Sequence, residues 1–267
     1  MQKPVLPNSA ETELTRQAFC DVHGAYTEHG RRIFGHEVWF GCKACLNAQR
    51  VETEKAMRLE EARSSVWTYQ QLFGQWIPKA FAGPMKDFYL LDSEMTEAFF
   101  TVEKYVLDFY VRSKNGQGLF FTGNAGTGKT KLACGVLQRL FPEIVGCYVT
   151  LPDLGDRIRQ TWKSQPGEPI PYSEARLVNA VCRTPLLVLD EIGTLDKSND
   201  IDLLFKVIDY RYRNLLPTIC ISNVGLDGLN GIYGNRVMRR IKERNLEIKF
   251  SWKPWYERNQ ESSATQS

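Results

Sequence analysis

From about residue 95 onward, the chain alternates between short, predominantly apolar runs and longer segments with apolar positions at helical spacing. Because a strand that is buried on both faces shows no polar alternation, the short runs predict central strands of a sheet. Strands are expected at 118–122, 145–150, 185–189, 217–222 and 246–251, and helices at 95–113, 131–140, 152–163, 173–182, 200–213 and 234–242. This alternation predicts an α/β fold in which helices cover both faces of a parallel sheet.

The first 94 residues follow a different pattern. Residues 1–15 are polar and are expected to form a loose tail, whereas 18–47 are rich in Gly, Cys, His and aromatic residues. A charged run over 51–64 predicts a bridging helix, since it has no wide apolar face. The stretch 65–94 is aromatic and interrupted by Pro and Gly, which is typical of a linker that packs on the next domain. The expected organisation is a module at 1–50, a linker at 51–94, a core at 95–258 and a disordered tail at 259–267.

Composition and charge narrow the class of protein only a little. The chain has 267 residues, 43% of them hydrophobic, and a net charge of +3, as in an ordinary globular protein. It has no apolar run near the roughly 20 residues that span a bilayer and no apolar signal core at its N-terminus, so a cytoplasmic protein without membrane contact is expected. Residues 236–258 carry eight Lys or Arg and three Glu, which indicates either a solvated helix face or a basic binding edge.

A glycine-rich segment between the strand at 118–122 and the next helix fits the phosphate-binding spacing G-x-x-x-x-G-K-[ST]. Its glycines let the backbone turn N–H groups toward phosphates, Lys129 would reach the β- and γ-phosphates, and Thr130 would bind Mg²⁺. The alternative is a flexible turn that happens to carry a lysine. The predicted nucleotide-binding residues are Gly123, Asn124, Ala125, Gly126, Thr127, Gly128, Lys129, Thr130 and Lys131.

Two further strand ends carry polar residues suited to the same site. Asp190 ends the apolar run at 185–189 and is expected to hold Mg²⁺, while Glu191 directly after it would polarise an attacking water. Taken alone, this acidic pair could instead cap a helix. Asn223 follows the strand at 217–222, where it could hold the attacking water, although Asn is also common at such positions as a turn residue.

Four residues near the N-terminus have the spacing of a metal site. Cys20 and His23 form one close pair and Cys42 and Cys45 another, with 18 residues between the pairs. Two such pairs across a loop suit a tetrahedral structural zinc ion. A segment this short cannot bury a large core and needs a cross-link such as a bound metal to fold. The alternatives are reduced cysteines without a metal, or His29 or His36 in place of His23.

The order of these motifs resembles the DnaC/IstB group of AAA+ ATPases, and more narrowly the DnaC-type replicative helicase loaders. The resemblance covers roughly residues 70–256 and is most specific at Asp190–Gly193 and Gly234–Arg240. It implies ATP as the nucleotide, and it implies that arginines of the second segment reach the ATP of a neighbouring subunit. Arg240 and Arg236 are the candidates; Arg239 stands where the family usually has an acid.

The resemblance also implies partners and architecture. It implies a core without a C-terminal lid, an N-terminal zinc module that docks on a DnaB-type helicase, and self-association on that helicase. Trp162 lies where DnaC-like loaders place an aromatic residue that contacts single-stranded DNA. Beside Lys163 it could stack on a base, or it could be an ordinary core residue.

The function expected from the sequence is ATP-dependent loading of a hexameric replicative helicase onto single-stranded DNA. One alternative is an IstB-like helper that delivers a transposase to DNA. Another is a P-loop kinase of a small metabolite, which the pair Asp190 and Glu191, Asn223 and the arginine segment disfavour. The expected cofactors are ATP, Mg²⁺ and Zn²⁺.

Overall fold

The computed structural model describes residues 13–85, 88, 90, 92–163, 172–194 and 199–257. The chain divides into two compact units, Met1–Glu60 and Glu61–Ser267. The tail predicted to be disordered at 259–267, and the first twelve residues of the predicted N-terminal tail, lie outside the described residues.

The first unit contains an antiparallel sheet of three strands in the order β1-β2-β3. These are β1 (Glu13–Cys20), β2 (Gly24–Ile33) and β3 (His36–Trp39). The prediction of a loose tail through residue 15 is wrong at its end, because Glu13, Leu14 and Thr15 pair with β2. Most residues of β1 are exposed, so its sequence lacks the apolar alternation from which a strand is recognised.

The helix α1 (Lys43–Phe73) begins in the first unit and ends in the second. It extends beyond the predicted helix at 51–64 in both directions. Tyr69, Leu72 and Phe73, which the sequence placed in an aromatic linker, are buried residues of its last turns and belong to the core of the second unit.

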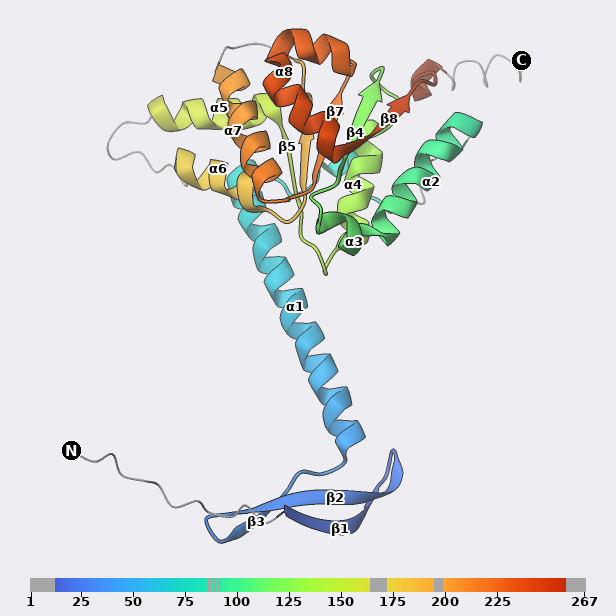
Figure 1. The fold of residues 1–267 in the computed structure, drawn as a ribbon, viewed down its shortest axis with the longest axis vertical. Coiled ribbons are helices and arrows are strands. Elements are labelled where there is room, and N and C mark those ends of the chain that lie inside the picture. Colours follow the sequence, from blue (N-terminus) through green and yellow to red (C-terminus); the bar gives the residue numbers. More distant parts are fainter. Residues whose placement is uncertain are drawn as a thin grey trace, which may run out of the picture. The chain divides into compact units, whose positions relative to one another are not determined.

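The second unit is an α/β domain with a sheet of five strands, in the order β5-β6-β7-β4-β8 (Figure 1). All neighbouring strands are parallel, which confirms the fold class predicted from the apolar runs. The strands are β4 (Gly118–Gly123), β5 (Cys147–Thr150), β6 (Leu187–Asp190), β7 (Thr218–Ser222) and β8 (Asn245–Phe250).

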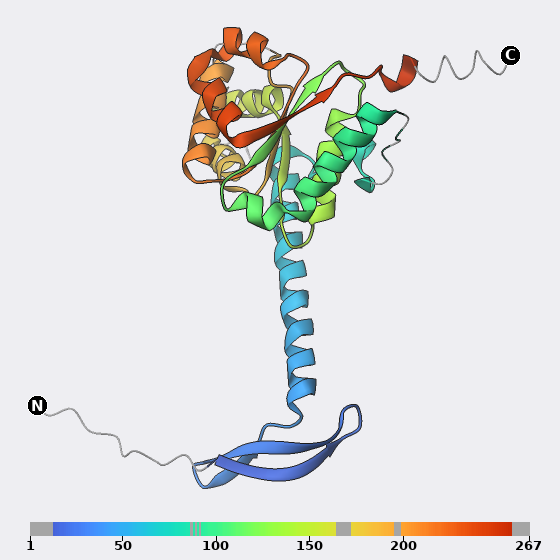
Figure 2. The ribbon, with the colours of Figure 1, turned by 45° about the vertical axis from the view of Figure 1, so that its right-hand side comes forward.

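Helices cover both faces of this sheet (Figure 2). One face packs against α2 (Ser93–Leu107), α3 (Phe109–Ser113) and α4 (Lys129–Leu140). The other packs against α5 (Leu151–Lys163), α6 (Glu174–Arg183), α7 (Asn199–Arg213) and α8 (Leu226–Arg244). A short 3₁₀ helix, η1 (Lys79–Phe81), precedes α2. Neighbouring strand residues such as Leu119 and Phe120 enter opposite core clusters, which explains the uninterrupted apolar runs.

The described C-terminal part of the domain contains α8, β8 and one further helical turn. The helix predicted at 234–242 is the second half of α8, which has non-helical backbone angles at Gly234 (φ 74°, ψ 163°). After β8, the described residues up to 257 contain one helical turn, at 255–257, and no helical lid. Within the described ranges, no helix is both long and apolar enough to span a membrane.

Candidate nucleotide and metal sites

The glycine-rich loop connects the carboxyl end of β4 to the first turn of α4. Gly126 and Gly128 have φ angles of 76° and 97°, in a region that residues with a Cβ rarely adopt. A Cβ on Gly128 would lie 2.6 Å from the ring of Phe88, and a Cβ on Gly126 would lie 2.9 Å from the ring of Tyr256. Both positions therefore require glycine. The loop leads into the N-terminus of α4, and free backbone N–H groups at a helix N-terminus bind anions readily.

Lys129 lies folded against this loop. Its Nζ donates hydrogen bonds to the carbonyl oxygens of Gly123 (2.7 Å) and Asn124 (2.6 Å). The residue is only 5% exposed, and burial lowers the pKa of Lys129 to about 8, against the opposing effect of Asp190. A phosphate would be a stronger partner for this cation than two neutral carbonyls, so its surroundings fit a nucleotide.

Asp190, at the end of β6, is 5% exposed and accepts three hydrogen bonds. Its Oδ2 accepts from the hydroxyls of Thr130 (2.7 Å) and Tyr148 (3.1 Å), and its Oδ1 from the backbone N–H of Glu191 (2.7 Å). Burial raises the pKa of Asp190, and the three donors oppose that shift. The structure thus brings together the two residues predicted to hold Mg²⁺, and a hydroxyl beside a carboxylate suits this oxygen-preferring ion.

Glu191 has an unusual backbone for a residue with a side chain, with φ at 58°. Such strained conformations are frequent at functional sites. Desolvation raises the pKa of the Glu191 carboxyl, and the charges of Asp190 and Asp153 raise it further. The side chain is exposed, as a group that meets water and substrate must be.

Asn223 is exposed and follows β7, which lies between β4 and β6. It therefore lies at the same edge of the sheet as the glycine-rich loop and Asp190. The residue before it, Ser222, is buried and donates to the carbonyl of Ile192 while accepting from the N–H of Val224. Ser222 thereby ties the end of β7 to the segment that follows Glu191.

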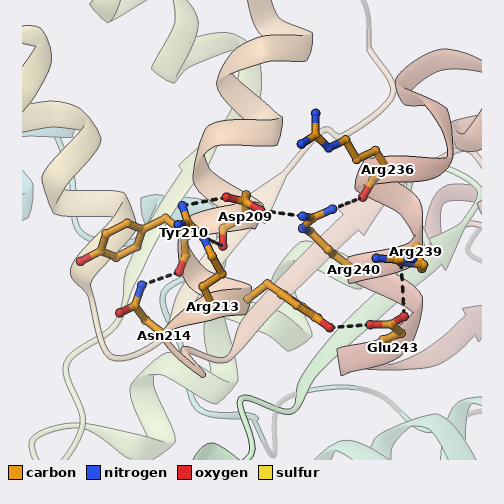
Figure 3. A network of polar contacts seen from close by, with 9 residues as sticks. Asp209, Tyr210, Arg213, Asn214, Arg236, Arg239, Arg240 and Glu243 are labelled. Carbon is orange, nitrogen blue, oxygen red and sulfur yellow. Dashed lines mark hydrogen bonds and ion pairs between the residues drawn. The ribbon is translucent and has the colours of Figure 1, made fainter.

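The two candidate arginines on α8 differ in their surroundings (Figure 3). Arg240 forms an ion pair with Asp209 of α7 at 2.7 Å, its side chain is 14% exposed, and it donates to the carbonyl of Arg236 at 2.7 Å. Arg236 is exposed, with its guanidinium 4.6 Å from the ring centre of Phe205. Arg239, which departs from the family pattern, pairs with Glu243 on its own helix at 3.5 Å. Arg240 is therefore held within its own chain, and Arg236 is the more accessible of the two.

In the first unit, the side chains of Cys20, His23, Cys42 and Cys45 converge, with ligand atoms within 4.8 Å of one another. The Nδ1 of His23 lies 3.3 to 3.7 Å from the three sulfurs, and two of the sulfurs are 3.5 Å apart. A tetrahedral zinc with Zn–S bonds of about 2.3 Å separates its ligand atoms by about 3.6 to 3.8 Å. The cluster therefore fits zinc, and the other two histidines lie in β2 and β3 outside it.

The fold of the first unit explains how these four residues meet. Cys20 ends β1 and His23 lies in the turn to β2, while Cys45 is in the first turn of α1. Gly24 and Gly41, beside the two ligand pairs, have φ angles of 77° and 76°, which allow the sharp turns that bring the pairs together.

Trp162 and Lys163 end helix α5. Trp162 is 57% exposed, which disagrees with the alternative that it is a core residue. Its indole N–H donates to Glu174 at 2.8 Å, and Glu174 also pairs with Lys206 at 3.9 Å. The ring is thus oriented at the surface, as a base-stacking residue needs.

Two residues that contact the candidate nucleotide site were not predicted from the sequence. Tyr148 lies within an apolar strand, where a tyrosine indicates only core packing, yet its hydroxyl binds Asp190. Trp252 follows the strand predicted at 246–251 and belongs to none of the predicted site motifs, yet its indole N–H donates to the carbonyl of Thr127 at 2.9 Å. Neither contact has a signal in the spacing of residues, because each joins segments far apart in the chain.

Comparison with known proteins identifies the core. The family described as IstB-like ATP binding protein matches residues 103–241, which are 139 of the 267 residues. The replicative helicase loader DnaC of Escherichia coli (strain K12) is 28% identical over 148 residues, which cover 54% of this chain and 58% of that protein. The chain thus spans somewhat more than half the length of this curated relative. The resemblance noted in the sequence is confirmed.

Solved structures show the same core. The crystal structure of the DnaC helicase loader is 26% identical, with a TM-score of 0.56, and the match covers 64% of this chain and 98% of that one. The crystal structure of DnaI, at 24% identity and a TM-score of 0.54, covers 65% of this chain and 94% of that one. These matches confirm that the α/β domain is a core of the AAA+ type.

Proposed function

The chain belongs to the IstB-like ATP binding protein family, and from this premise we propose that it is an ATPase that loads a DnaB-type hexameric helicase onto single-stranded DNA. The observation that carries the proposal is the likeness to the DnaC helicase loader, whose solved structure is covered over 98% of its length. The zinc-type cluster gives the first unit a folded platform for a partner.

The nucleotide site supports ATP hydrolysis through a division of roles. Lys129 would exchange its two carbonyl partners for the β- and γ-phosphates, while the other residues of 123–131 surround them. Thr130 and Asp190 would hold Mg²⁺, which supplies neutralisation of phosphate charge when bound. Glu191 would accept the proton of the attacking water, and Asn223 would orient that water.

The arginine that completes a neighbour's site is proposed to be Arg236. Arg240 was the first candidate from the sequence, but reaching another subunit would cost it the ion pair with Asp209. Arg236 can extend from α8 without breaking an ion pair of that kind, and a guanidinium there would stabilise charge developing on the γ-phosphate. Arg240 then positions the segment that carries Arg236, since it bonds that residue's carbonyl.

The remaining parts of the chain are assigned to partners. The zinc module predicted at 1–50 would dock on the helicase, the stretch at 51–94 would connect it to the core at 95–258, and copies would associate on the helicase. Trp162 and Lys163 would contact single-stranded DNA, because an exposed ring beside a cation suits stacking with phosphate contact.

A second candidate function has a specific observation in its favour. The matching family is described as IstB-like ATP binding protein, so the same ATPase core could serve a transposase instead of a helicase. The ATP chemistry would be unchanged, and only the partner of the first unit would differ.

Capture of defined partners separates the two. The full chain, immobilised with or without ATP, is offered a purified DnaB-type helicase and, in parallel, an IstB-dependent transposase. The proposal predicts ATP-dependent retention of the helicase and loss of retention when Cys42 and Cys45 are both changed to Ser. Retention of the transposase alone would replace the loader by the transposition helper.

A further inference from the structure

A segment after the last strand lies across the outside of the glycine-rich loop. Residues Trp252–Tyr256, here named the C-terminal strap, begin one residue after the end of β8, with Ser251 in between. The indole N–H of Trp252 donates to the carbonyl of Thr127 at 2.9 Å, and the backbone N–H of Trp255 donates to the carbonyl of Gly126 at 3.1 Å. The strap therefore binds two successive carbonyls of the phosphate-binding loop.

These two bonds determine which way the loop's N–H groups face. In a planar trans peptide, the C=O of one residue and the N–H of the next point in opposite directions. With the carbonyls of Gly126 and Thr127 directed at the strap, the N–H groups of Thr127 and Gly128 are directed away from it, into the loop. Gly128 has a φ of 97°, and a glycine peptide turns over easily when nothing holds it.

Trp252 is fixed well enough to serve this role. It is 6% exposed, its ring packs on Phe250 at 4.8 Å between centres, and Phe88 meets it edge-on at 6.4 Å. Phe88 also fills the space in which a side chain on Gly128 would lie. One aromatic cluster thus supports the loop from outside through both a hydrogen bond and packing.

We propose that Trp252 is a positioning residue for the phosphate-binding loop: its indole N–H holds the Thr127–Gly128 peptide with the N–H toward the phosphates. The inference deepens the proposed function and rests on nucleotide binding at this loop.

The test compares Trp252→Phe with Trp76→Phe. The first substitution keeps an aromatic ring and removes the N–H. The second removes another indole N–H that donates to a backbone carbonyl, that of Gly146 at 2.9 Å, at a place outside the nucleotide site. The full-length variants are studied by thermal unfolding, by calorimetric titration with ATP and with adenosine, and by NMR of glycine-labelled protein without nucleotide.

Both variants are expected to lose similar thermal stability, whereas only Trp252→Phe should bind ATP about three- to tenfold more weakly, the usual worth of one hydrogen bond. Its adenosine affinity should be unchanged, and its Gly128 amide signal should broaden or double. Equal ATP affinities and Gly128 signals in the two variants would overturn the inference. The NMR readout needs neither nucleotide nor helicase, so a chain that captures no helicase yet shows the Gly128 effect would fail the proposed function and retain the positioning role.

Discussion

Lys129 is a residue whose protonation is expected to respond to a bound phosphate. Its ammonium group is buried against two carbonyls, and burial lowers the pKa of Lys129 to about 8. Phosphate oxygens would stabilise the charged form and move this pKa upward. Nucleotide binding and protonation of this lysine should therefore be coupled.

The coupling predicts proton uptake. At about pH 8.5 to 9, above the pKa of Lys129 in the nucleotide-free protein, much of this lysine is neutral before ATP binds and protonated afterwards. ATP binding should therefore take up protons in this range, and the ATP affinity should fall as the pH rises. Below about pH 7 the group is protonated in both states, and this uptake should vanish. Calorimetric titrations in buffers of different ionisation enthalpy measure it. Lys129→Arg, whose guanidinium stays protonated, should show no such uptake; equal uptake in both proteins would contradict the assignment.

Glu191 is predicted to separate hydrolysis from binding. Glu191→Gln keeps the shape of the side chain and removes the carboxylate, so ATP affinity should stay within about threefold while hydrolysis falls at least 100-fold, as for loss of a general base. Phosphate release and nucleotide affinity are measured on the same protein, with the exposed Glu97→Gln of α2 as control. Hydrolysis by Glu191→Gln at the wild-type rate would remove the water-activating role.

At this scale, sequence and structure agree where a function resides in neighbouring residues. The loop at 123–130 and the pair Asp190 and Glu191 are each contiguous in the sequence, so each could be recognised as a motif. Both follow predicted strands of one parallel sheet, so their proximity could be expected. The contacts of Tyr148 with Asp190, of Trp252 with Thr127 and of Arg240 with Asp209 join distant segments. They depend on how strands and helices pack, which spacing alone does not record.

Among the elements, the N-terminal strands and the long helix were the least predictable. The strands β1 and β3 are largely exposed, so they carry no apolar alternation. Helix α1 is polar along most of its 31 residues, and its buried residues lie in its last third, from Ala62 onward. The strands of the second unit were predicted to within about two residues. Burial on both faces leaves an unambiguous apolar pattern in β4, β5, β6 and β7, whereas β8 at the sheet edge alternates between buried and exposed residues.

Zinc content is predicted for the first unit. The purified, reduced chain should hold about one zinc per chain, and His23→Ala should lower zinc affinity at least tenfold, because tetrahedral structural sites need all four ligands. His29→Ala and His36→Ala, in the neighbouring strands, should keep the metal. Metal analysis and competition with a chelator provide the measurement. Zinc that stays bound in the absence of His23, or is missing from the wild-type chain, would contradict the assignment.

The end of helix α5 is predicted to bind single-stranded DNA. Trp162→Ala should weaken binding by about 1–3 kcal/mol, the worth of one stacked base, with little effect on ATP affinity. Trp67→Ala is the matched control, because Trp67 is 58% exposed on α1 and Trp162 is 57% exposed. Fluorescence anisotropy of a labelled oligonucleotide measures the affinity. If both variants lost the same affinity for single-stranded DNA, the effect would not be specific to Trp162, and the assignment would be contradicted.

For the whole molecule, the parallel sheet is what unites the motifs. Parallel strands place their carboxyl ends at one edge, so the loop after β4, Asp190 after β6 and Asn223 after β7 lie in one site. The alternation of apolar runs and helical segments predicted the fold class, and motifs at the ends of the predicted strands predicted the nucleotide site. The sequence did not decide whether Arg236 or Arg240 is the arginine proposed to reach a neighbouring subunit, because that choice depends on an ion pair between α7 and α8.

We propose that ATP acts at sites shared between copies of this chain while a helicase is placed on DNA. The most direct measurement is retention of a DnaB-type helicase on a closed single-stranded DNA circle after a high-salt wash. Wild-type chain with ATP should load the helicase, whereas Lys129→Ala and Arg236→Ala should each fail alone. Their mixture should recover part of the loading, because one copy brings the intact loop and the other the arginine. Loading by Arg236→Ala alone at the wild-type level, or no recovery at any mixing ratio, would contradict the shared site. A wild-type chain that loads no helicase would contradict the proposed loader function.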